Sequence, residues 1–134
     1  MKLTSRYRFS ASHRLDTPAL SPEENRKLYG KCNYPHGHGH DYVLEITVDG
    51  PVDENGQVVN REAMDALVRE RILSRLDHKN LNADIPEMAG SVATTENLAT
   101  LVHRALAAGW TLPARLARVR ISETARNTFE LEVA

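Results

Sequence analysis

Residues 38–49, H-G-H-D-Y-V-L-E-I-T-V-D, place two histidines directly before an alternating strand pattern. Every second side chain from Tyr42 to Val48 is apolar, and polar side chains lie among the positions between them. Because side chains alternate between the two faces of a strand, this period predicts a half-buried strand. His38 and His40 continue the apolar parity, so both are expected on the core-facing side, at the strand's N-terminal end.

Residues 2–13 largely alternate as well and predict a second strand, whose apolar face ends at His13. If the two strands pair antiparallel, His13 reaches the same end of the sheet as His38 and His40. The three side chains also share one face. The sequence therefore predicts a three-histidine cluster at one end of a strand pair.

Two helices are expected in the middle of the chain. Residues 60–76 carry apolar side chains at helical spacing, and Asn60 is a suitable N-cap. A second helix is expected to begin at Thr94 or Thr95, either of which could cap it, and to end at Gly109. These two helices supply the apolar stripes that can cover the predicted sheet.

The C-terminal region predicts a hairpin with strands at residues 116–123 and 127–133. By contrast, residues 14–37 read as a long loop with a short helical turn near residues 21–27, and loops of this length tend to be functional. The order strand, strand, helix, helix, strand, strand indicates one α+β domain over residues 1–134.

The composition narrows the classes of function. The formal net charge is -1 and no basic block occurs, so the composition gives no sign of a nucleic-acid or anionic-lipid partner. No apolar run is long enough to cross a membrane, and the N-terminus lacks the apolar core of a signal peptide. The chain has a single cysteine, which excludes an internal disulfide and fits a reducing compartment. A cytoplasmic protein is expected.

The predicted histidine cluster suits a zinc ion. Three neutral imidazoles from His13, His38 and His40 would leave a fourth tetrahedral position for water or substrate, as in catalytic zinc sites. A loop with incidental histidines is the alternative reading, which the position of His13 on the same face disfavours. His36 lies in the loop and is expected to be a spectator or to contact a ligand of the metal.

Cys32 lies among polar loop residues, so a role in the core is not expected. It could be a fourth zinc ligand that closes the site, or a separate nucleophile or base. The neighbouring Lys31 and a nearby cation would favour the thiolate.

Three more residues bear chemical groups at unusual places. Asp77 and His78 follow a helix end, where they could act together on a neighbouring group, the aspartate by polarising it and the histidine by shuttling a proton, although a plain surface histidine is the alternative. Glu123 ends an otherwise apolar strand face, so its carboxylate should be paired or functional. An arginine, or a 2-amino-pyrimidinone ring with adjacent N–H donors, would satisfy it.

With these residues together, the chain resembles the 6-pyruvoyl-tetrahydropterin synthase family. No single stretch is specific, but the matching stretches occur in order over nearly the whole chain. They are FSASHRL (9–15), LSPEENRKLYGKCNYPHGHGHDY (20–42), LDHKNL (76–81), TTEN (94–97) and SET (122–124).

The resemblance implies a role for each candidate residue. It implies that His13, His38 and His40 bind zinc. It implies that Cys32 is the catalytic base and that Asp77 and His78 assist it. It also implies that Glu123 anchors the pterin and that Thr94 and Thr95 line its pocket.

The resemblance also implies the tunnelling fold (T-fold), an antiparallel four-stranded sheet with two helices on one face, in the order ββααββ. Three such sheets would close into a barrel and two trimers would stack into a homohexamer, with each site at a subunit interface. Such a barrel would leave no exposed sheet edge.

The family has at least two chemistries, both on 7,8-dihydroneopterin triphosphate. One, a lyase reaction, eliminates triphosphate and gives 6-pyruvoyl-tetrahydropterin, on the route to tetrahydrobiopterin. The other releases acetaldehyde and triphosphate and gives 6-carboxy-tetrahydropterin, towards queuosine. Cys32 precedes His38 by six residues, as in the first branch, whereas His36 stands where that branch often has asparagine. The expected function is the pyruvoyl reaction with zinc, and the carboxy reaction is the alternative.

Two readings from other classes stay open. In a zinc-stabilised binding module, Cys32 would complete a closed site with the three histidines, but Glu123, Asp77 and His78 would have no role. A zinc hydrolase would need a glutamate base beside the histidines, and none is evident in the sequence.

Overall fold

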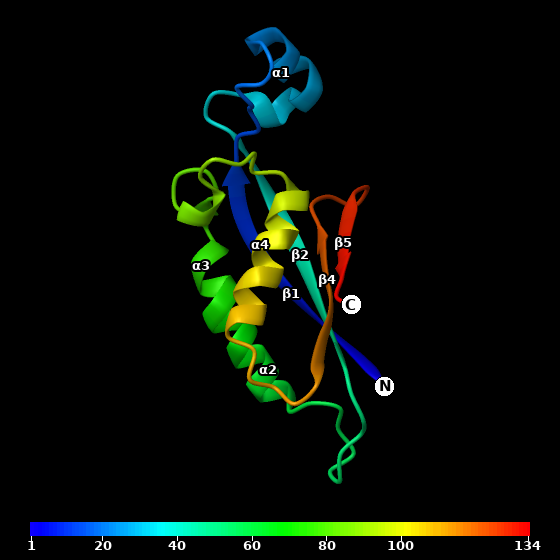
Figure 1. The fold of residues 1–134 in the computed structure, drawn as a ribbon. Helices are drawn as coiled ribbons and strands as arrows, with labels where there is room; N and C mark the ends of the chain where they lie inside the picture. Colours follow the sequence, from blue (N-terminus) through cyan, green and yellow to red (C-terminus); the bar gives the residue numbers. More distant parts are fainter.

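The computed structural model describes residues 1–134 and shows one five-stranded sheet with helices on one face (Figure 1). The strand order is β3-β1-β2-β4-β5, and every neighbouring pair is antiparallel except β1 and β3, which are parallel. The strands are β1 (Lys2–His13), β2 (His38–Asp49), β3 (Lys79–Asn80), β4 (Arg115–Ser122) and β5 (Thr128–Glu132).

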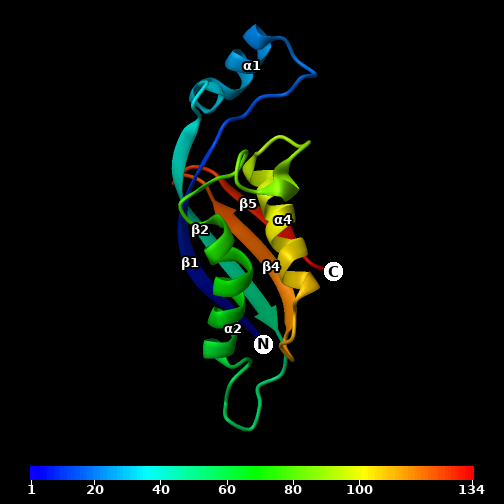
Figure 2. The same ribbon diagram turned by 90° about the vertical axis from the view of Figure 1, so that its left-hand side faces the viewer.

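Two helical segments lie side by side and cover the apolar face of the sheet. One is a continuous helical run in which the π-helical segment η2 separates α2 from α3, and the other is α4. The run from α2 to α3 lies over β1 and β2, whereas α4 lies over β4 and β5 (Figure 2). The helical segments are α1 (Pro22–Tyr29), η1 (Gly30–Asn33), α2 (Arg61–Val68), η2 (Arg69–Leu73), α3 (Ser74–Leu76), η3 (Pro86–Met88) and α4 (Thr95–Ala108).

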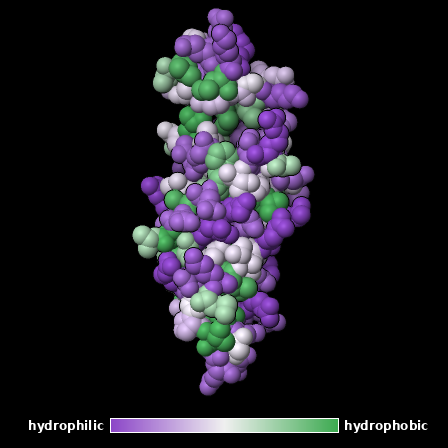
Figure 3. All heavy atoms as spheres, turned by 90° about the vertical axis from the view of Figure 1, so that its right-hand side faces the viewer, coloured by the Kyte–Doolittle hydropathy of each residue, from purple (hydrophilic) through white to green (hydrophobic).

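The alternating pattern of β2 explains why only one sheet face carries helices. The apolar side chains from Tyr42 to Val48 that share a parity are fully buried in the core between sheet and helices. On the other face, charged side chains pair across strands, as in the ion pair between Arg120 and Glu45 at 3.3 Å. A polar face of this kind can remain solvated in an antiparallel sheet. On the side seen in Figure 3, hydrophilic residues also predominate and apolar residues occur in small groups.

The sheet differs from the four-stranded prediction by the short strand β3. After α3 the chain runs beside the end of β1, where the His78 amide donates to the Ser10 carbonyl at 2.6 Å. The Leu81 amide donates to the Ser12 carbonyl at 2.8 Å. Two residues are too few to show a strand period, so the sequence pattern could not predict this strand.

Residues 14–37 form an arm that projects beyond the end of β1 and β2 and carries α1 and η1 (Figure 1). The predicted helical turn is a full helix, because Ser21 and Glu24 form a capping box at its start. The arm is fixed to the sheet end by the Leu15 amide, which donates to the Cys32 carbonyl at 2.7 Å. Cys32 is thereby held near the end of the strand pair.

Candidate metal and substrate site

The predicted antiparallel pairing is confirmed, and its register brings His13, His38 and His40 to the same end of the sheet. β1 and β2 pair antiparallel, with His13 opposite His38 and Ala11 opposite His40. His13 is fully buried, while the His40 ring lies 4.9 Å from the His13 ring, centroid to centroid. The strand pair therefore presents imidazoles at the end where the arm begins.

Four potential ligand atoms converge at this place, all within 4.8 Å of one another. The Nε2 atoms of His13 and His40 are 3.1 Å apart, and the Cys32 Sγ lies 3.8 Å from the His40 Nε2. The Glu123 Oε1 lies 3.1 Å from the His40 Nε2 and 3.6 Å from the His13 Nε2. With zinc–nitrogen bonds of about 2.0–2.1 Å, tetrahedral ligands are roughly 3.3–3.4 Å apart, so the two imidazoles are spaced as a zinc site requires.

The orientation of His13 is set by its second nitrogen. The His13 Nδ1 lies 2.8 Å from the Ala93 carbonyl oxygen, which can only accept, so this nitrogen carries the proton. The lone pair is then on Nε2, which faces His40 and Glu123. A metal-binding histidine typically has such a hydrogen bond behind it.

Burial keeps both imidazoles neutral. The pKa of His13 is lowered by burial, and burial together with the neighbouring His13 and His38 lowers the pKa of His40 to about 4. At neutral pH both rings therefore offer lone pairs to a metal ion rather than protons to an acceptor.

Cys32 differs from the sequence-based expectation. Lys31 is exposed to solvent, whereas burial and the carboxylate of Glu123 raise the pKa of the Cys32 thiol. The prediction that Lys31 favours the thiolate is therefore wrong for the metal-free protein. A cation bound among these four side chains would act in the opposite direction.

His38 stands outside the four converging residues. It is exposed at the start of β2, and its ring contacts that of His40 with centroids 4.7 Å apart at 85°. Its role as the third zinc ligand stays a prediction. His36 is exposed in the arm and is not part of the cluster.

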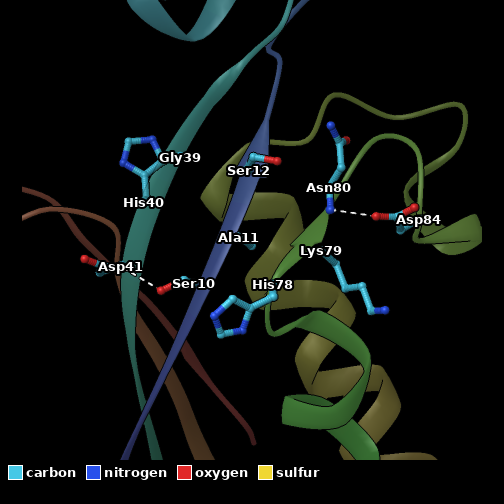
Figure 4. Close-up of a pocket in the computed structure, with 10 residues that line it drawn as sticks. All are labelled: Ser10, Ala11, Ser12, Gly39, His40, Asp41, His78, Lys79, Asn80 and Asp84. Carbon is cyan, nitrogen blue, oxygen red and sulfur yellow. Dashed lines mark hydrogen bonds between the residues drawn. The ribbon is translucent and has the colours of Figure 1, made fainter.

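Asp77 and His78 lie elsewhere. They lie beside Ser10, whose parity on β1 is opposite to that of His13, and His78 lines an open hollow with Ser10 and Asp41 (Figure 4). The Asp77 Oδ1 accepts from the Ser10 amide at 2.9 Å and lies 3.1 Å from the His78 Nδ1. The Ser10 amide and His78 lower the pKa of Asp77. The two side chains thus contact each other, but neither is among the residues that converge with Cys32 and Glu123, so their joint action on a neighbouring group stays a prediction.

Glu123 and Thr95 form one wall of the cluster. Glu123 follows β4 directly, and burial raises its pKa, while the nearby Thr95 hydroxyl opposes that effect. Thr95 is buried at the first turn of α4, and its Oγ1 makes no hydrogen bond of good geometry. The Thr94 hydroxyl instead caps the helix by accepting from the Asn97 amide at 3.3 Å. Of the two threonines, Thr95 therefore has the free hydroxyl beside the carboxylate.

Two groups at the site were not found from the sequence. The Ala93 carbonyl acts through the backbone, so no side-chain pattern marks it. Tyr42 was assigned only to the apolar face of its strand, yet its hydroxyl lies 3.5 Å from the His13 Nδ1. A tyrosine on a core face next to two histidines was the available signal, because a buried hydroxyl needs a partner.

Known proteins share both the sequence and the fold. The family model described as 6-pyruvoyl tetrahydropterin synthase matches residues 2–133. The 6-pyruvoyl tetrahydrobiopterin synthase of Drosophila melanogaster is 45% identical over 126 residues, covering 93% of this chain and 75% of that protein. The enzyme of the same name from Poecilia reticulata is 48% identical over 121 residues, covering 89% of this chain and 81% of that protein.

The solved structure of the Caenorhabditis elegans 6-pyruvoyl tetrahydropterin synthase matches with a TM-score of 0.92 at 33% sequence identity. The match covers 100% of this chain and 96% of that chain, so the whole fold is shared. In addition, no helix of the chain combines the length and apolar character needed to span a membrane.

Proposed function

Because the chain belongs to the 6-pyruvoyl tetrahydropterin synthase family, we propose that it is a zinc-dependent lyase. Its substrate would be 7,8-dihydroneopterin triphosphate and its products 6-pyruvoyl-tetrahydropterin and triphosphate. The observation that carries this proposal is the convergence of two imidazoles, a thiol and a half-buried carboxylate at one end of the strand pair.

The donor set fits zinc. His13 and His40 have neutral rings, and the spacing of their Nε2 atoms is close to that of tetrahedral ligands. We expect these two to hold the ion together with His38, the neighbouring histidine on the same strand face. Zinc would supply a Lewis acid that polarises oxygen atoms of the substrate side chain.

Cys32 is the proposed base. It lies at the rim of the histidine cluster, on the arm that the Leu15 amide fixes to the sheet end. As a thiolate it would remove a carbon-bound proton from the substrate side chain, and triphosphate would leave with the electron pair of its carbon–oxygen bond. Tautomerisation then redistributes the oxidation level within the product, so the reaction needs no redox cofactor.

Glu123 is the proposed anchor for the pterin ring. Its carboxylate can accept from the ring N–H and the 2-amino group, which point in parallel towards such a pair of oxygens. The buried Thr95 hydroxyl is free to contact the same ligand or the carboxylate. Orientation by this wall would bring the reacting carbon to Cys32.

Asp77 and His78 would come from a neighbouring subunit. In one chain His78 lines the hollow with Ser10, Asp77 contacts the Ser10 amide, and neither is among the side chains that converge with Cys32. The outer edge of β1 is paired only over two residues, and β5 has no neighbour beyond it, so both ends of the sheet are open to pairing with further copies. A trimeric barrel would close these edges, and two such trimers would stack into a hexamer. In this assembly Asp77 and His78 of one subunit could meet Cys32 of a neighbouring subunit.

A second candidate function is the 6-carboxy-tetrahydropterin reaction on the same substrate. The six-residue spacing from Cys32 to His38 and the names of the relatives favour the pyruvoyl reaction. A third candidate, a zinc-stabilised binding module, is favoured by one observation, since the Cys32 Sγ is close enough to His40 to serve as a fourth ligand.

Mass spectrometry of the product made from 7,8-dihydroneopterin triphosphate tests the three candidates. We expect 6-pyruvoyl-tetrahydropterin and triphosphate. Acetaldehyde with 6-carboxy-tetrahydropterin would establish the second candidate instead. Absence of turnover by the zinc-loaded protein, together with loss of a sulfur ligand from the zinc spectrum of Cys32→Ala, would establish the third.

A further inference from the structure

Asn33 is a buried polar residue next to Cys32 that the proposed mechanism does not use. Its side-chain nitrogen donates to the Leu15 carbonyl at 2.6 Å and to the Asp16 Oδ1 at 3.0 Å. A carbonyl and an ionised carboxylate can only accept, so these two partners fix which end of the amide is the nitrogen. Both protons of that nitrogen are therefore used to tie the arm to the segment that follows β1.

These bonds continue the pairing of β1 with β2 past its last residue pair. The ladder ends at His13 opposite His38, and the residues after His13 meet the arm instead. The Leu15 amide donates to the Cys32 carbonyl at 2.7 Å, and the Leu15 carbonyl accepts from Asn33. The side-chain amide of Asn33 thus takes the place of a backbone N–H opposite Leu15, as in a strand pair.

A further contact holds the same part of the arm. The Arg14 Nε donates to the Asn33 carbonyl at 3.2 Å, and the Arg14 Nη2 lies 3.6 Å from the Asp16 Oδ1. Cys32 and Asn33 end the short helix η1 and belong to no strand. The sheet ladder fixes the histidines, whereas these local bonds must fix the thiol, whose Sγ lies 3.8 Å from the His40 Nε2.

We propose that Asn33 is a positioning residue for Cys32, which holds the thiol at the histidine cluster by tying the arm to Leu15 and Asp16. A reacting group that is misplaced by about 1 Å can lose about 10²-fold in rate. Without the two side-chain bonds the arm would have more conformations, and ordering the thiol for each turnover would cost entropy. This inference rests on the proposed function, in which Cys32 is the base.

Asn33→Asp tests the proposal, because it keeps the size of the side chain but puts an oxygen where the nitrogen donates. The kcat for 7,8-dihydroneopterin triphosphate should fall about 10–100-fold, while zinc content and affinity for the non-reacting pterin biopterin should not change. Asn33→Ala removes the donors without adding a charge and should lower kcat about tenfold. Calorimetry counts the biopterin-binding sites in each preparation, and kcat is expressed per site, so an unfolded fraction does not affect it.

Alkylation by iodoacetamide gives a second readout, because Cys32 is the only cysteine. In the unaltered, zinc-loaded protein, bound biopterin should cover the thiol and slow its alkylation. In Asn33→Asp the ratio of the rates without and with biopterin should fall towards one, because the thiol no longer lies beside the ligand. A loss of overall stability would not change this ratio in the folded, ligand-bound fraction.

A reversed pair tests whether the contact with Asp16 contributes. Asp16→Asn alone keeps an acceptor for Asn33 and should change kcat by about twofold at most. Combined with Asn33→Asp, it restores a donor between the two side chains in the opposite direction. Because one of the two bonds of Asn33 returns, the combined variant should exceed Asn33→Asp about three- to tenfold in kcat.

Asn25→Asp is the matched control. Asn25 is also buried, and its side-chain nitrogen donates to the Thr17 carbonyl at 2.9 Å and to the Ser21 carbonyl at 3.1 Å. The same substitution therefore removes buried donors from the outer part of the same arm. Its melting temperature should fall, while kcat per site and the protection of Cys32 by biopterin stay unchanged.

Three results would overturn the inference. They are an unchanged kcat per site in both Asn33 variants, an equal fall of kcat in Asn25→Asp, and undiminished protection of Cys32 in Asn33→Asp. The proposed function fails separately, if the unaltered protein binds no biopterin or if Cys32→Ala retains normal turnover. Binding of biopterin and loss of turnover in Cys32→Ala, together with normal turnover in both Asn33 variants, would refute this inference alone.

Discussion

At the scale of single residues, burial decides the chemistry of the site. The His13 ring is fully enclosed, with one nitrogen held by a backbone carbonyl and the other facing the cluster. Glu123 is nearly enclosed and has no cationic side chain beside it other than the histidines, which are neutral. A carboxylate in such surroundings costs free energy unless a cation or a set of N–H donors meets it. The protein is therefore expected to gain stability when metal and ligand bind.

The first prediction concerns Glu123→Gln, which keeps the size of the side chain but puts an amide donor where an acceptor stood. If the carboxylate faces the N–H groups of a pterin, the mismatch should cost roughly 1–3 kcal/mol, and more for a charged pair. Affinity for biopterin should fall by about tenfold to a few hundredfold in a calorimetric titration. Zinc content should not change. Unchanged affinity together with a lowered melting temperature would show that Glu123 is only a structural partner.

The second prediction concerns the pH dependence of the metal-free protein. The pKa of His40 is about 4 in the folded chain, below its ordinary value of about 6.5. Between these two values the unfolded chain binds the proton and the folded chain does not, so the free energy of unfolding should fall as the pH falls through this window. Urea titrations from pH about 7 to about 4 should show this slope, and His40→Gln should reduce it. An identical slope in the variant would mean that His40 is not kept neutral by folding.

At the scale of elements, the strand pair β1–β2 and the arm between them build the site. The strands were predicted well because a period of two over a dozen residues leaves little choice of face, and the histidines continue that period. The position of Cys32 could not be predicted in the same way. It depends on hydrogen bonds within the arm, which has no period, and on Gly37, where the chain turns back towards β2.

The third prediction tests that turn. Gly37 has φ +80, and an added Cβ would lie 2.6 Å from the His13 carbonyl oxygen, a backbone atom that cannot move without displacing the strand. Gly56 has nearly the same φ, +79, but an added Cβ would meet nothing within 4 Å. Gly56→Ala should therefore cost only the backbone strain, about 1–2 kcal/mol, and keep zinc. Gly37→Ala should cost more and should lower the zinc content, as measured by thermal melts and metal analysis. Equal costs and equal zinc contents in the two variants would contradict this account.

At the scale of the whole molecule, the two groups of predicted catalytic residues lie apart. Sequence reasoning could place Asp77 and His78 just after a helix, but the segment that follows α3 has no period from which a sheet face could be read. The parallel pairing of β3 with β1 determines on which face of the sheet these two residues lie, and His78 adopts a positive φ of 60° at this point. A single chain therefore holds His13, His40, Cys32 and Glu123 in one cluster and Asp77 with His78 in another. Under the proposed function, a second copy would bring the two groups together.

The last prediction uses this separation. Cys32→Ala and His78→Ala should each be inactive, but unfolding and refolding them together should restore activity. A site that takes Cys32 from one subunit and His78 from its neighbour is intact in about a quarter of the sites of a random equal mixture. The matched control mixes Cys32→Ala with Glu123→Gln, two residues that converge in the same chain, so no mixed assembly contains an intact site and activity should stay at the level of the variants. If the first mixture also stayed inactive although native mass spectrometry showed mixed oligomers, Asp77 and His78 would not act on the neighbour's Cys32. Recovery in both mixtures would instead mean that Glu123 and Cys32 serve different sites, and the cluster seen within one chain would not be the catalytic unit.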